Sequence, residues 1–185
     1  MKRIFLAIIP VVLVALCLSV GSVEQSLRER QETESADQFE TAIEIIKKYE
    51  GLHSKKHWPY VGYGHRVWPG DGIKKGSVLS QKRAEEILRK DLTKLCAEFR
   101  SYGRDSIIMA VLAYNIGPNA AKRSTVAKKL QAGDRDIKAH YLAHAKYRGK
   151  TLSQLKRRRT EEYERLFYRE TEVSTKTAML SLILY

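Results

Sequence analysis

The sequence predicts a mostly helical α+β domain with one small β-hairpin, and two observations predict it. In several segments apolar residues recur at helical spacing, with charged residues on the other face. Residues 57–68 differ, because aromatic and β-branched residues there are punctuated by a proline and glycines, as in a hairpin. A chain of 185 residues has room for one such domain plus a short targeting or tail segment.

The first helix of the domain is expected to end at Glu50. Ala42, Ile45 and Ile46 recur at helical spacing before it, and Gly51 is placed as the residue that follows a helix. Later helices, for a total of about six, are expected at about 80–103, 106–116, 125–132, 137–145 and 151–168. The helix 106–116 is apolar on more than one side, which indicates a central, buried position. The expected caps are Asp105, Ser124 and a capping box of Thr151 with Gln154.

The amino terminus has the pattern of an export signal. Met1-Lys2-Arg3 precedes a nearly unbroken apolar run over residues 4–20, and small residues follow it. The run is long for a signal and short for a span, and Pro10 interrupts it, so an uncleaved anchor in the inner membrane is a second interpretation. The predicted organisation is a signal peptide or membrane anchor (1–22), a polar linker (23–38), a catalytic domain (39–170) and a C-terminal tail (171–185).

The charge of the chain indicates an anionic partner. Its 34 basic and 21 acidic residues give a net charge of +13, which suits nucleic acid, a lipid surface or the acidic polymers of a cell wall. The export signal argues against nucleic acid. Only two cysteines occur, so a disulfide framework is not expected. His53 and His57 are four residues apart, but Gly51 and Pro59 argue against a helix there, and we expect no metal and no other cofactor.

One stretch, Tyr49 to His65, has the composition of a site. Glu50 is its only acidic residue, and the next carboxylate along the chain is Asp71. A lone carboxyl beside a glycine-rich turn and several aromatic residues fits an acid that cleaves sugars. The same pattern also fits an ordinary helix end, so the other motifs of the chain must decide.

Six separated motifs occur in a fixed order. They are Glu50-Gly51-Leu52, Gly62-Tyr63-Gly64-His65, Gly76-Ser77-Val78-Leu79-Ser80, Tyr114-Asn115-Ile116-Gly117, Arg123-Ser124-Thr125 and Leu155-Lys156-Arg157-Arg158-Arg159. Each motif is weak alone, but the ordered set resembles the phage-type lysozymes, or endolysins, of glycoside hydrolase family 24. The resemblance covers roughly residues 40–168.

The resemblance implies a two-lobed lysozyme fold, preceded here by the apolar amino-terminal helix. Its cleft would bind peptidoglycan and cleave the β-1,4 bond between N-acetylmuramic acid and N-acetylglucosamine, with Glu50 as the general acid. It implies substrate contacts for Tyr63, His65, Asn115 and Arg158, and Arg158 is also expected to pair with Glu50. Asn115 either presents its amide to the glycan or simply caps the end of the central helix. For His65 a structural bond to a neighbouring backbone group or carboxylate is the favoured role. We expect a monomer that is exported and faces the periplasm or wall.

The sequence departs from the family pattern at the second catalytic position. The family places an Asp nine residues after the Glu and a Thr five residues before the turn His, and these positions hold Pro59 and Tyr60. His57 or Tyr60 is then expected to position the water. In a second interpretation no such residue is needed, and the protein is a lytic transglycosylase with a single Glu. In a third the chain is a degenerate wall-binding or basic polyanion-binding module.

Overall fold

The computed structural model describes residues 5–147 and 149–167, with side chains from residue 24 onward except that of Tyr147. The chain divides into two units, Met1–Asp37 and Gln38–Tyr185. Helix α1 (Phe5–Glu50) contains the predicted polar linker, so those residues are helical, and their side chains from residue 24 are mostly exposed. The side chains of the predicted signal or anchor and the tail 171–185 lie outside the described part. Among the described residues, no helix is long and apolar enough to cross a membrane.

The second unit is mostly helical, as predicted. Its further helices are α2 (Gln81–Glu98), α3 (Ser106–Ile116), α4 (Pro118–Arg123), α5 (Thr125–Gln131), α6 (Lys138–Leu142) and α7 (Ser153–Leu166). Short 3-10 segments occur at Lys55–His57, Arg100–Asp105 and Ala143–Ala145. The predicted hairpin is present as β1 (Tyr60–Val61) and β2 (His65–Arg66), which pair antiparallel with Tyr60 opposite Arg66.

A second antiparallel pair corrects the prediction of one hairpin. Strands β3 (Lys146–Tyr147) and β4 (Lys150–Thr151) pair with Lys146 opposite Thr151. Two-residue strands show no alternation in the sequence, so periodicity does not reveal them. Helix α4 was not among the expected helices, and Pro118 occupies its first turn, where the missing amide donor is tolerated.

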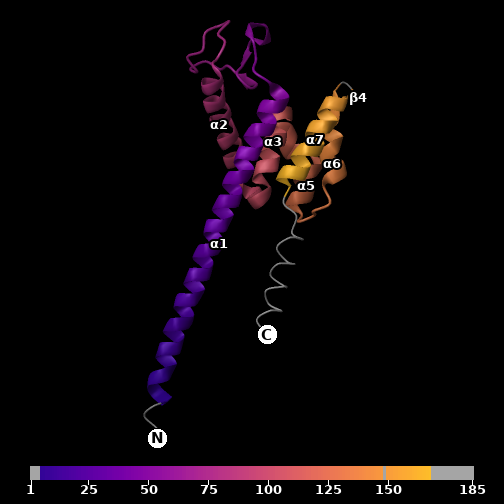
Figure 1. Ribbon diagram of the computed structural model, residues 1–185. Helices are drawn as coiled ribbons and strands as arrows, with labels where there is room; N and C mark the ends of the chain where they lie inside the picture. The colour runs from indigo at the N-terminus through magenta and orange to yellow at the C-terminus, as the bar shows by residue number, and fades with distance from the viewer. Residues whose placement is uncertain (1–4, 148, 168–185) are drawn as a thin grey trace. The chain divides into compact units, whose positions relative to one another are not determined.

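Helix α3 forms the centre of the core, as predicted. Its residues 107–113 are all buried, and Figure 1 shows it enclosed by the other helices of the unit. Apolar residues of α1, α2, α6 and α7 pack in the same core, among them Ile45, Ile46, Leu92, Tyr141 and Leu166. The core therefore fixes the last turns of α1, and with them the position of Glu50.

Residues 51–79 form a small lobe, and the helices from α2 to α7 form the large lobe. Figure 1 shows the small lobe as loops and the β1–β2 hairpin at the ends of α1 and α2. It is tied together by backbone hydrogen bonds from His53 to Gly62 (2.8 Å) and from Val67 to Pro59 (2.9 Å). The two-lobed lysozyme-like architecture that the resemblance implies is thus present.

The predicted caps are right in one case and wrong in two. The Ser124 hydroxyl accepts the Ala127 amide at 3.1 Å and caps α5. Asp105 precedes α3 but makes no capping hydrogen bond, because its carboxylate pairs with Arg135. The expected capping box of Thr151 and Gln154 is absent, since α7 begins after Leu152 without a side-chain cap and Thr151 lies in β4.

Candidate active site

Glu50 is the last residue of α1. Gly51 follows it with φ = 63°, a left-handed conformation that ends the helix without steric cost, and its amide bonds to the Lys47 carbonyl at 3.1 Å. The Glu50 side chain is 20 % exposed. The carboxyl is thus held at the edge of the core and is still reachable from outside.

Arg158 binds the Glu50 carboxyl. Its Nη1 lies 2.7 Å from Glu50 Oε1, which confirms the predicted pair between the first helix and the arginine run of the last. The Arg158 side chain is only 3 % exposed. Burial disfavours its charge, but Glu162 and Glu50 together raise the pKa of Arg158 above its usual value. Arg158 is therefore a permanent cation at this carboxyl.

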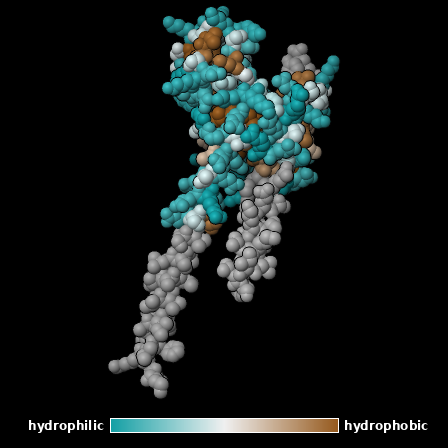
Figure 2. All heavy atoms as spheres, in the orientation of Figure 1, coloured by the Kyte–Doolittle hydropathy of each residue, from teal (hydrophilic) through white to brown (hydrophobic). Residues whose placement is uncertain are grey.

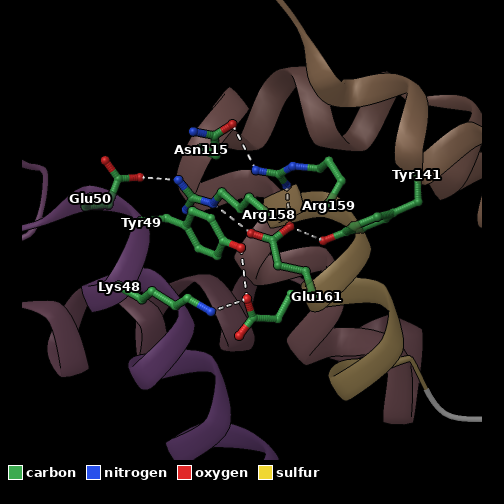
Figure 3. A network of polar contacts seen from close by, with 9 residues as sticks. Lys48, Tyr49, Glu50, Asn115, Tyr141, Arg158, Arg159 and Glu161 are labelled. Carbon is green, nitrogen blue, oxygen red and sulfur yellow. Dashed lines mark hydrogen bonds and ion pairs between the residues drawn. The ribbon is translucent and has the colours of Figure 1, made fainter. Parts of the chain in front are cut away.

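Arg158 belongs to a buried polar network, which Figure 3 shows from close by. Arg158 Nε donates to Glu162 Oε1 at 2.8 Å, and the Tyr141 hydroxyl donates to Glu162 Oε2 at 2.9 Å. Arg159 lies 2.6 Å from the same Oε2. Burial, with Glu162 beside it, raises the pKa of Tyr141 well above its usual value. Each buried charge here has an opposite charge beside it, which offsets much of the cost of desolvation.

The same network fixes the orientation of Asn115 at the end of α3. Arg159 Nη2 donates to Asn115 Oδ1 at 3.0 Å. A guanidinium has donors only, so the amide must turn its oxygen to Arg159 and its NH2 group away from it. Asn115 is exposed, and that NH2 group is therefore available to an acceptor such as a carbonyl oxygen.

A second set of contacts joins the end of α1 to α7. Both the Tyr49 hydroxyl (2.8 Å) and Lys48 Nζ (2.6 Å) bind Glu161 Oε2, as Figure 3 shows. The Arg158 guanidinium also lies over the Tyr49 ring, 5.8 Å from its centroid. Glu50 and Arg158 are thus held in register by contacts on both sides of the pair.

The hairpin lies beside the second oxygen of Glu50. A Cβ added at Gly64 would lie 3.5 Å from Glu50 Oε2 and 3.7 Å from the Tyr114 ring. The Tyr114 hydroxyl donates to the Tyr63 carbonyl at 2.8 Å, which anchors the hairpin to α3. Burial, with Asp91 and Glu50 nearby, raises the pKa of Tyr114, so this hydroxyl stays a donor. A side chain at position 64 would therefore be in van der Waals contact with the carboxyl.

His65 is held by two carboxylates. Its Nδ1 lies 2.6 Å from Asp91 Oδ2 and its Nε2 lies 3.2 Å from Asp71 Oδ2. Both ring nitrogens are thus engaged, which supports the structural role that the sequence favoured for this residue. The Tyr63 side chain is buried in the core and contributes its carbonyl to the hairpin anchor. The ring nitrogens of His65 are both occupied, the Tyr63 hydroxyl has no hydrogen bond to a described residue, and the predicted contacts of both side chains with substrate stay predictions.

The comparison with known proteins agrees with this geometry. The phage lysozyme family model matches residues 47–162, which include Glu50, the hairpin and Arg158. The chain belongs to the phage lysozyme family. It is 30% identical over 139 residues to an endolysin of Bacillus phage B103, an alignment that covers 66% of this chain and 51% of that protein. The chain thus matches about half the length of that relative.

Two further relatives support the same assignment. An endolysin of Acyrthosiphon pisum secondary endosymbiont phage 1 is 32% identical over 107 residues, covering 51% of this chain and 70% of that protein. The solved endolysin from Escherichia coli O157:H7 phage FAHEc1 matches with a TM-score of 0.56 and 25% identity. That match covers 68% of this chain and 90% of the solved one, so the shared fold extends over nearly the whole phage lysozyme structure.

The second catalytic position of this phage lysozyme family member holds no carboxylate. Tyr60 lies in β1 and is 44% exposed, and His57 lies in the turn 55–57 with its Nδ1 accepting the Ser54 amide at 2.9 Å. The structure shows no hydrogen bond from either side chain to Glu50 among the described residues. Their predicted role as helpers of Glu50 therefore stays a prediction.

The structure places His53 within electrostatic reach of Glu50, although its spacing from His57 in the sequence raised only the question of a metal ligand. The His53 ring contacts that of His57 in a tilted arrangement with centroids 4.6 Å apart, and its buried Nδ1 has no hydrogen-bond partner in the described part of the chain. Burial and the neighbouring His57 lower the pKa of His53, while Glu50 acts in the opposite direction. The imidazole is thus neutral near pH 7 and within electrostatic reach of Glu50. Its position three residues after Glu50 was the only signal for it in the sequence.

Proposed function

We propose that this protein hydrolyses peptidoglycan at the β-1,4 bond between N-acetylmuramic acid and N-acetylglucosamine. The observation that carries the proposal is the Glu50 carboxyl at the helix end, held on Oε1 by Arg158 and faced on Oε2 by the hairpin. A carboxyl so placed between two lobes can act as the general acid of a glycosidase. The endolysins that the chain resembles support the wall as its substrate.

Glu50 Oε2 is the oxygen that we assign to the proton transfer. Oε1 is occupied by Arg158, whereas Oε2 accepts no hydrogen bond from any described residue. A general acid must present its proton on the oxygen that faces the leaving group, and Oε2 is the oxygen that Arg158 leaves free. The proton then goes to the glycosidic oxygen as its bond to the anomeric carbon breaks.

Asn115 is the substrate-facing residue that the geometry supports best, and Arg158 is the residue that orients the acid. The Asn115 amide, oriented by Arg159, presents its NH2 group to an acceptor, and the acetamido carbonyl of an N-acetyl sugar is one. Arg158 acts mainly through Glu50, since its guanidinium is almost completely buried. We therefore assign recognition to Asn115 and orientation of the acid to Arg158.

For the attacking water we retain His57 and Tyr60 as the proposed helpers, because Tyr60 stands where the family has its Thr and His57 lies two residues before the position of its Asp. A second candidate function follows from the absence of any carboxylate between Gly51 and Gly70. In a lytic transglycosylase the substrate's own hydroxyl attacks, and one Glu is sufficient. If the protein cleaves no glycosidic bond, the degenerate binding module is the interpretation that remains.

Product analysis separates these reactions. Purified peptidoglycan is digested with the full chain and with Glu50→Gln, and the soluble fragments are analysed by mass. Hydrolysis gives reducing ends that carry one added water, and a transglycosylase gives anhydro ends without it. We expect reducing ends from the unchanged protein only. Absence of any fragment from a folded, unchanged protein would overturn the proposed activity.

The place of action is part of the same proposal. The apolar run over residues 4–20, the net charge of +13 and the endolysin relatives support a protein that is exported and faces the wall. Residues 1–22 would serve as a signal peptide or an inner-membrane anchor, residues 39–170 as the catalytic domain and residues 171–185 as a tail. All residues that we assign to the site come from one chain, which fits a monomer. Protease protection in spheroplasts tests the export.

A further inference from the structure

The small lobe has an unusual share of the exposed apolar side chains. Six large hydrophobic residues are exposed in the part of the chain whose side chains are described, and four of them lie in this lobe: Leu52, Tyr60, Trp68 and Val78. Trp68 is the most exposed of them, at 57%. Figure 2 shows hydrophobic residues gathered over the lobe with hydrophilic residues around them. Such a patch, rimmed by polar groups, indicates an interaction surface.

The charges around the patch are almost all positive. The small lobe has five basic residues, Lys55, Lys56, Arg66, Lys74 and Lys75, against one acidic residue, Asp71. None of the five forms an ion pair with a described residue, and all are exposed. Asp71 is exposed, but its carboxylate is engaged within the lobe, because its Oδ2 accepts the Trp68 amide at 2.5 Å and contacts His65. The lobe therefore presents a positive field around an apolar centre.

The exposure of Trp68 is a built feature of the lobe. Asp71 accepts its amide, and the Asp71 amide returns a hydrogen bond to the Trp68 carbonyl at 3.2 Å. The Arg66 guanidinium lies over the indole, 4.7 Å from the ring centroid. A tight turn thus holds the indole outward with a cation on one of its faces.

We propose that the small lobe is a docking surface for an anionic lipid bilayer. Leu52 and Val78 are aliphatic and offer neither hydrogen bonds nor flat rings to a hydrated polymer, whereas a bilayer accepts them below its headgroups. An indole beside arginine and lysine side chains is the arrangement that favours the membrane interface. Docking there would hold the enzyme at the membrane side of the wall, independently of which glycosidic reaction it performs.

The test reads the environment of Trp68 itself. The chain has two tryptophans, so Trp58→Phe in the full chain leaves Trp68 as the only one. Its emission is recorded with vesicles of phosphatidylglycerol and phosphatidylcholine in equal parts, and with phosphatidylcholine alone. We expect a blue shift, and quenching by brominated acyl chains, with the anionic vesicles only. Lipid binding by another segment leaves this signal unchanged. If Trp58→Phe does not fold, the quenching of the unchanged protein is compared with that of Trp68→Phe. The difference between the two then reports on Trp68.

Matched charge reversals test the electrostatic part. The double variant Lys74→Glu, Lys75→Glu should need at least about tenfold more anionic lipid to reach half of the Trp68 emission shift, since each surface cation contributes to anionic membrane binding. The double variant Arg100→Glu, Lys128→Glu makes the same charge change in the large lobe. It should alter the required lipid concentration less than about threefold. An unshifted Trp68 emission with anionic vesicles, or equal loss in both double variants, would overturn the proposal. So would a shift caused by soluble muramyl glycan fragments but not by vesicles, because it would assign the patch to the cleft.

Discussion

Arg158 Nη1 and Glu50 Oε1 lie 2.7 Å apart although 108 residues separate them in the sequence. The contact joins the end of the first helix to the middle of the last, and the buried Glu162 holds Arg158 from its other side. The pair therefore connects the folding of the large lobe to the orientation of the proposed acid.

Removal of the Arg158 guanidinium should destabilise the fold. Arg158→Gln leaves Glu162 completely buried with one cation fewer, and loss of one partner from a buried pair typically costs about 3–5 kcal/mol. We expect the free energy of unfolding, measured with urea, to fall by that amount. Arg157→Gln is the control, because Arg157 is exposed, and it should change the value by less than about 0.5 kcal/mol. Equal effects of the two variants would contradict a buried role for Arg158.

A methyl group at Gly64 should reduce activity more than it reduces stability. Gly64 and Gly70 both have positive φ, 97° and 102°, so alanine should cost about 1–3 kcal/mol at either position. Only the added Cβ at Gly64 meets the Glu50 carboxyl, and the one at Gly70 meets nothing within 4 Å. We expect kcat on peptidoglycan to fall at least about tenfold for Gly64→Ala and to change little for Gly70→Ala. A comparable loss in both would show that strain, and not the carboxyl, is responsible.

Asn115→Asp should separate binding from folding. The new carboxylate keeps an acceptor for Arg159 and loses the two donors of the NH2 group. We expect unchanged or slightly increased thermal stability and a KM for glycan oligomers about tenfold higher, which is the loss of one or two hydrogen bonds. A normal KM in this variant would remove Asn115 from the substrate-binding residues.

The stability of the domain should depend on pH through His53. Its pKa in the folded protein is lowered, so the unfolded chain binds the proton more readily. The free energy of unfolding is then highest above the unfolded pKa of about 6.5 and declines as the pH falls through 6.5 toward the lower folded value. His53→Gln should flatten the curve between about pH 7.5 and 5, measured by urea unfolding at each pH. Curves for the variant and the unchanged protein that run parallel would contradict the assignment. Burial also lowers the pKa of His144, so a residual slope should remain in the curve of the His53→Gln variant.

The sequence predicted those parts of the fold that leave a periodic pattern of apolar residues. Apolar spacing placed the end of the first helix at Glu50, and the same signal placed the central helix at 106–116, because burial of one helix face leaves a periodic trace. The β3–β4 pair leaves no such trace in two-residue strands. Asp105 occupies a cap position in the sequence, but Arg135, 30 residues away, binds its carboxylate instead. Local patterns do not contain such long-range pairings.

The candidate site, like the fold, could be predicted from the sequence only in part. The order of the motifs predicted Glu50 and its pair with Arg158, since both positions belong to conspicuous segments. The burial of His53 and the approach of the hairpin to the Glu50 carboxyl depend on how the hairpin folds back over the helix end. Spacing along the chain cannot show that approach, because it is made by residues that the sequence marks only as turn elements.

The most direct measurement is the rate at which Glu50→Gln solubilises purified peptidoglycan, compared with the unchanged protein under the same conditions. Glutamine has nearly the same shape and cannot donate a proton as an acid. Because general acid catalysis contributes about 10²–10⁴-fold, we predict a loss of at least about a hundredfold in a variant that remains folded by circular dichroism. A Glu50→Gln protein that retains more than about a third of the rate would contradict Glu50 as the catalytic acid.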